Sequence, residues 1–153
     1  MIGAVVSSAM VAAASLDQSI KQLPTRRRIG VLAYSDYSLV ADASNGLRWY
    51  VPLAAAWSSI SGAAAVVGWT GHPGDAHALA LAAMVVGVAA HFLVTGVFAF
   101  PALLSQRRVR GNQRALKQTF DRFERWQTVR ALIDVATLAA AVWALLTSRP
   151  WTW

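Results

Sequence analysis

Residues 78–104 read ALALAAMVVGVAAHFLVTGVFAFPALL and contain no charged side chain. One helical crossing of a bilayer takes about 20 apolar residues, so this stretch is long enough to span a membrane. Its one ionisable side chain is His91, near the middle. Pro101 lies near the end, where neighbouring helices can satisfy the carbonyl group that a proline leaves free. The stretch predicts a transmembrane helix.

Three further apolar stretches lie on either side of it. Residues 49–69 are flanked by Trp and Tyr, as is common at membrane interfaces, and residues 129–147 form the last predicted span. Residues 2–20 are rich in Ala, Ser and Val, and Asp17 and Gln18 make this the weakest of the four predicted spans. Charged residues make up 14% of the chain, against roughly 25% in soluble domains. We therefore expect an all-α integral membrane bundle of four transmembrane helices, with residues 1–153 as a single membrane domain.

The basic residues are concentrated in two segments. Of 14 Lys and Arg residues, five lie in residues 21–48 and eight in residues 107–130. Four crossings place both segments on one side of the membrane, and the positive-inside rule assigns that side to the cytoplasm. We therefore expect a multi-pass protein of the cell membrane, with both termini outside and residues 21–48 and 105–128 in the cytoplasm.

Both cytoplasmic segments have apolar residues at helical spacing, which predicts amphipathic helices at the membrane surface. Asn45 and Gly46 predict a turn before the second span. The segment from residue 107 runs directly into the last span, and steps of three and four residues define one stripe there. This stripe, which we expect to face the bundle, consists of Phe120, Phe123, Gln127, Arg130, Asp134 and Thr137.

Polar residues inside a span are costly and by default are candidates for function. Arg130 and Asp134 are four residues apart and can pair within the helix. Two interpretations remain open: the two charges only neutralise each other, or they line a pocket with Asp17 and Gln18 of the first span. His91 has the same two interpretations, either as a buried histidine bonded to a neighbour or as a base.

The sequence predicts no metal and no cofactor. It contains no cysteine, and no second intramembrane histidine exists to complete a bis-His haem site or a multi-His metal site. His72, Asp75 and His77 have a spacing that matches no standard zinc motif, so an ordinary loop is the better interpretation. Haem or quinone stays open as a ligand. We expect no nucleic-acid partner, because no soluble fold accompanies the basic segments.

Two short motifs resemble the anthrone oxygenase family of small membrane proteins. VTGVFAFPALL, at 94–104, is similar to a Thr-rich segment that leads into Asn-x-Pro-x-Asn. Thr95 and Pro101 match this pattern, whereas Ala99 and Leu103 stand where the family usually has asparagines.

The second motif is RWQTVR, at 125–130, which resembles a Trp-Asn-x-x-Arg pattern at the start of the last helix. Trp126 and Arg130 match, and Gln127 replaces the asparagine. The resemblance implies a four-helix membrane protein. It also implies oxidation of anthrones to anthraquinones without a metal or flavin.

These observations support two functions. In the first, a pocket binds a flat, hydrophobic phenolic substrate, His91 or Asp134 removes a proton, the anion reacts with dioxygen, and Arg130 holds the developing oxyanion. The expected substrate-binding residues are Asp17, Gln18, Thr95, Trp126 and Gln127. In the second, the chain is a non-catalytic subunit of a larger membrane complex, or binds lipid or quinone. The expected partners are membrane lipids, a hydrophobic small molecule, and a second copy of the chain or a larger complex. A transporter is a weaker third option.

Overall fold

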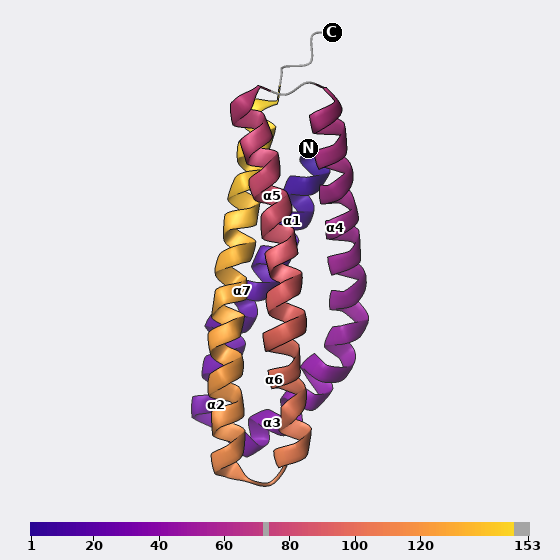
Figure 1. Ribbon diagram of the computed structural model, residues 1–153. Helices are drawn as coiled ribbons and strands as arrows, with labels where there is room; N and C mark the ends of the chain where they lie inside the picture. Colours follow the sequence, from indigo (N-terminus) through magenta and orange to yellow (C-terminus); the bar gives the residue numbers. More distant parts are fainter. Residues whose placement is uncertain (72–73, 149–153) are drawn as a thin grey trace.

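The structure, a computed structural model, describes residues 1–71 and 74–148. Its helices form a bundle of four columns (Figure 1). The N-terminus, the end of the second column and the start of the third lie at one end, which we call the upper end. The turn between the third and fourth columns lies at the opposite, lower end. No β-strand occurs in the described residues, so the predicted all-helical bundle is confirmed.

Short π-helical segments (η1 to η3) and one 3-10 segment (η4) separate the α-helices. In chain order the elements are α1 (Ile2–Asp17), η1 (Gln18–Gln22), α2 (Leu23–Ile29), α3 (Val31–Val40), η2 (Ala41–Gly46), α4 (Leu47–Thr70), α5 (Asp75–Leu93), η3 (Val94–Ala99), α6 (Phe100–Ser105), η4 (Gln106–Val109) and α7 (Gln113–Thr147). The first column is α1 with α2, the second is α4, the third runs from α5 to η4, and the fourth is α7.

The chain reverses at Gly30, and the predicted turn at Asn45 and Gly46 is wrong. Gly30 has a φ of 84°, a conformation that glycine adopts without steric cost. Gly46 instead lies in the helical segment η2, where an added Cβ would come 2.8 Å from the backbone oxygen of Ala41. Position 46 needs glycine because the backbone packs closely there. From the sequence alone, a glycine needed for packing cannot be told from one needed for a turn.

The stripe predicted on the last helix faces the bundle. Its members Phe120, Phe123, Gln127, Asp134 and Thr137 are each no more than 2% exposed. Arg130 is half-buried. The spacing of these residues in the sequence therefore predicted the buried face of α7 correctly.

The upper half of the bundle is packed through small residues. At Gly87 of α5, an added Cβ would lie 2.1 Å from the Oγ1 atom of Thr137 on α7, so only glycine allows these two helices to approach so closely. The surrounding buried residues are Ala4, Ala65, Ala80, Leu81, Met84, Ala140, Ala141 and Ala144. The alanines among them let helix backbones come close together.

The lower end has a separate core built from the two basic segments together with η3 and α6 of the third column. It consists of Leu23, Tyr34, Ala99, Ala102, Leu103, Leu116, Phe120 and Phe123. Arg26, 9% exposed, pairs across it with Asp121 at 2.7 Å and with Glu124. A hydrogen bond from Lys117 and the nearby Arg26 lower the pKa of the Asp121 carboxyl. The segments predicted to be amphipathic helices are helical, and they pack on each other.

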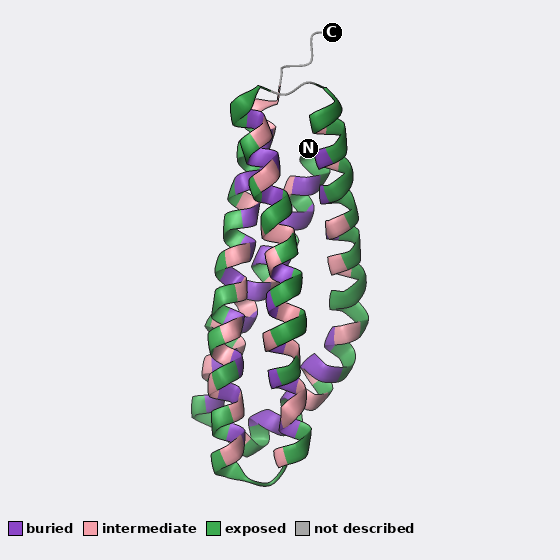
Figure 2. Ribbon diagram, viewed as in Figure 1, coloured by how far each residue is buried: buried purple, intermediate pink, exposed green. Residues whose placement is uncertain are grey.

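Three helices are long and apolar enough to cross a membrane: Val31–Thr70, Asp75–Val109 and Gln113–Thr147. They contain the predicted spans 49–69, 78–104 and 129–147. The first predicted span, 2–20, is helical but is not one of these three. Apolar side chains cover much of the outside of the bundle, and α4 is largely exposed along its length (Figure 2).

Candidate functional site

A cavity of about 410 Å³ lies in the lower half of the bundle. Its wall comes from the first column, the start of α4, the third column and α7. Three polar residues of the wall, Gln18, Asp42 and Thr95, each belong to a different π-helical segment. Wide turns of this kind occur often at functional sites, and this cavity is where all three converge.

His91 of α5 lies on the wall and is held from behind by Asp134 of α7. The His91 Nδ1 atom is 2.6 Å from Asp134 Oδ1, and the hydroxyl of Ser15 donates to Asp134 Oδ2 at 2.5 Å. Trp57 packs edge-on against the imidazole, with ring centroids 5.1 Å apart. A neutral imidazole whose Nδ1–H donates to a carboxylate has a free lone pair on Nε2. This pair therefore has the arrangement of an oriented general base.

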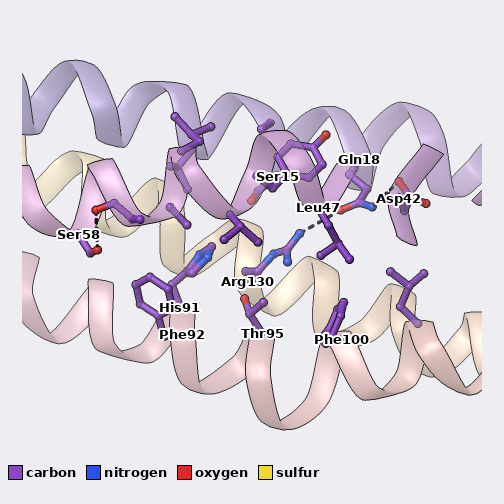
Figure 3. A pocket seen from close by; sticks show the side chains of 18 of the residues that line it. Ser15, Gln18, Asp42, Leu47, Ser58, His91, Phe92, Thr95, Phe100 and Arg130 are labelled. Atoms are coloured by element: carbon purple, nitrogen blue, oxygen red, sulfur yellow. Dashed lines mark hydrogen bonds between the residues drawn. The ribbon is translucent and has the colours of Figure 1, made fainter. Parts of the chain in front are cut away.

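Arg130 lies between His91 and the polar side chains of Gln18 and Asp42 (Figure 3). Its Nη2 atom donates to Gln18 Oε1 at 3.0 Å, and the amide nitrogen of Gln18 lies 3.3 Å from Asp42 Oδ1. Ser38 donates to the other oxygen of Asp42 at 2.7 Å. The guanidinium is thereby fixed from one side, towards the lower end of the bundle.

Two donors at the cavity wall have no hydrogen-bond partner within the described residues. They are the hydroxyl of Thr95 and the Nε–H group of Arg130, both buried at the atom level. Leaving a buried donor unpaired costs about 1–3 kcal/mol. A ligand oxygen that accepted from these two groups would remove that cost, so the cavity is suited to a ligand with a carbonyl or oxyanion.

The cavity opens sideways, between α4 and the third column. Tyr50 and Val51 of α4 and Phe92 of α5 line it and are also 42%, 59% and 44% exposed. These three side chains lie on the apolar outer surface of the bundle. A hydrophobic molecule could therefore enter from the side of the bundle rather than from either end.

The structure brings together some of the residues predicted to form the site. Thr95, His91, Arg130 and Gln18 line the cavity, while Asp134 and Gln127 lie directly behind its wall, and Gln127 donates to the backbone oxygen of Ser15 at 3.2 Å. No ion pair joins Arg130 to Asp134 in the described residues; Asp134 pairs with His91 and Arg130 binds Gln18.

Asp17 and Trp126 do not line the cavity. Asp17 faces outward and pairs with Lys21 at 2.6 Å, whereas the adjacent Gln18 lines the cavity. Trp126 stacks on Phe98 at the outer surface, with ring centroids 4.1 Å apart. Neither placement supports the predicted contact with a ligand in the cavity.

Asp42, Ser15 and Tyr50 are cavity residues that the sequence did not indicate. Asp42 is 7% exposed, although it lies in a segment expected to be at the surface. One signal was available: Asp42 follows Ser38 by four residues on a helical face. The sequence could not show that this face turns inward.

The described residues contain no group of three His, Cys, Asp or Glu side chains that could hold a metal. Asp75 and His77, expected in a loop, lie in the first turn of α5. The Nδ1 atom of His77 is 3.2 Å from the Thr147 hydroxyl. His72, its predicted neighbour, lies outside the described residues.

Comparison with known protein families, curated proteins and solved structures found no match for this chain. The functional proposal therefore rests on the geometry and chemistry of the cavity.

Proposed function

We propose that this chain is a four-span membrane protein whose lower end is cytoplasmic. The apolar outer surface and the small-residue core favour placement in a bilayer. The lower end carries most of the Lys and Arg residues, as the positive-inside rule requires of a cytoplasmic face. The column of α1 crosses with the other three because it is packed among them.

The absence of cysteine makes this placement directly testable. Gly74→Cys at the upper end and Gln113→Cys at the lower end are exposed positions. In intact cells, we expect a membrane-impermeant maleimide to label Gly74→Cys at once and Gln113→Cys only after lysis. The reverse order, or equal labelling of both, would contradict the proposed sidedness.

We propose further that the cavity binds a flat hydrophobic molecule with an acidic hydroxyl or an activated methylene, and that His91 removes its proton. The observation that carries this proposal is the arrangement of an imidazole base and two unpaired donors on one wall. The volume of about 410 Å³ lies in the range of small-molecule sites. Lateral opening suits a substrate that dissolves in the bilayer.

The reaction that fits best is oxygenation of an anthrone-like substrate, the activity to which the sequence resemblance pointed. His91 Nε2 takes a proton from the methylene carbon, and the resulting charge lies on the carbonyl oxygen, which accepts hydrogen bonds from Arg130 and Thr95. The carbanion carbon bonds to dioxygen, and the peroxide is protonated. Loss of the remaining C–H proton and cleavage of the O–O bond release water. The methylene and dioxygen thus become a carbonyl and water.

Oxygen uptake by the purified protein tests this function. With an anthrone and a metal chelator present, we expect dioxygen and anthrone to be consumed in equal molar amounts, faster than without protein. No acceleration by folded protein would overturn the oxygenase proposal. If such protein still bound the anthrone or a quinone, the non-catalytic function in ligand binding would be favoured, because Arg130 and Thr95 can also donate to a quinone carbonyl.

A further inference from the structure

A second groove, outside the cavity, lies on the surface between η3 and α7. It is lined by Phe98 of η3 and by Arg122, Arg125, Trp126 and Val129 of α7, and it has a volume of about 490 Å³. The four residues of α7 are spaced by one, three or four positions, which places them on one side of the helix. The groove lies where the basic lower end meets the apolar part of the bundle.

The floor of the groove is aromatic and its rim is cationic. The rings of Phe98 and Trp126 stack with an interplanar angle of 14° and a centroid distance of 4.1 Å. Arg122 and Arg125 have no carboxylate within 4.0 Å among the described residues, whereas Arg26, Arg27, Arg110 and Lys117 are all in ion pairs. The two unpaired guanidiniums are thus free to bind an anion.

Exposed apolar side chains lie beyond the groove, on the same two columns, towards the middle of the bundle. Val129 and Leu132 of α7 are 39% and 66% exposed. On the facing column, Leu93 and Val97 are also exposed. A ligand at this position therefore meets charge at one end and hydrocarbon at the other, which is the polarity of a phospholipid.

We propose that this groove is a binding site for one anionic phospholipid of the cytoplasmic leaflet. The guanidiniums of Arg122 and Arg125 bind the phosphate group, because their planar donors match phosphate oxygens. The glycerol region lies on the Trp126 and Phe98 rings, and an acyl chain follows Val129 and Leu132. This site rests on the proposed membrane placement and is independent of the chemistry in the cavity.

Native mass spectrometry of the full chain in detergent tests the site, with phosphatidylglycerol and phosphatidylcholine of identical acyl chains as probes. We expect the wild type to retain phosphatidylglycerol preferentially. The double variant Arg122→Gln/Arg125→Gln loses two charge-assisted contacts, so its apparent affinity should fall about tenfold or more. The matched control is Arg107→Gln/Arg108→Gln, which removes the same charge from exposed residues of the 3-10 segment and should retain the lipid.

Equal loss of lipid by the two double variants would overturn the site in favour of general attraction by charge. Displacement of phosphatidylglycerol by inorganic phosphate alone would also overturn it, because the chains would then contribute nothing. Circular dichroism of each variant checks that the helices are intact. Cysteine labelling tests the sidedness of the protein in the membrane, whereas lipid retention in mass spectrometry tests the groove. Failure of the membrane placement and failure of the lipid site are therefore distinguishable.

Discussion

We expect the rate of anthrone-dependent oxygen uptake to fall by about two to four orders of magnitude when His91 is replaced by Gln, the usual contribution of a positioned general base. Gln can accept a hydrogen bond but cannot take a proton at neutral pH. It also keeps a polar group next to Asp134, whose carboxylate lies 2.6 Å from the imidazole in the native protein. The initial rate of oxygen consumption at saturating substrate measures the change.

The matched control for His91→Gln is His77→Gln. His77 is the other buried histidine of α5, at 8% exposure, and it bonds to Thr147 near the upper end, away from the cavity. We expect this variant to keep the wild-type rate. If both variants lost activity equally, or if His91→Gln kept it, His91 would not be the base.

Replacement of Arg130 by Met should lower the rate by about 10²–10³, the cost of losing a donor to a developing oxyanion. Met has a similar length and no charge, so the helix and the apolar part of the contact remain. The loss should appear mainly in kcat, because the negative charge on the oxygen is greatest after proton removal. Steady-state oxygen uptake over a range of anthrone concentrations separates kcat from KM.

Arg107→Met is the control for the loss of charge, since Arg107 is exposed on η4 and does not line the cavity. Thermal unfolding followed by circular dichroism shows whether either variant weakens the bundle. An Arg130→Met protein that is folded and fully active would exclude Arg130 from oxyanion stabilisation.

Hydropathy and charge sufficed to predict the helical bundle, since apolar length and helical spacing are local properties of the chain. They also predicted the buried face of α7, where Gln127 and Asp134 lie inside. The site was only partly predictable. Adjacent residues of a helix point about 100° apart. Here Gln18 lines the cavity and Asp17 faces outward, and the sequence does not say which of the two lies inside.

The sequence also did not show which side chains on other helices would bind Arg130 and Asp134. Spacing alone allowed Arg130 and Asp134 to pair with each other, but His91 and Gln18 lie close enough to take one each. The inward position of Asp42 likewise depends on how α3 and η2 fold against the first and third columns, which no local pattern encodes.

The π-helical segment η3, residues 94–99, has a consequence for the register of the third column. A π-type turn closes its hydrogen bonds one residue later than an α-type turn. It therefore changes the direction in which the side chains of all later residues of the column point. Above this segment the column directs His91 inward, and below it the same column directs Leu103 into the lower core. If one residue were deleted from η3 and an α-helix restored, the two halves would turn by about 100° relative to each other. The third column could then keep His91 inside the bundle or Leu103 inside the bundle, but not both.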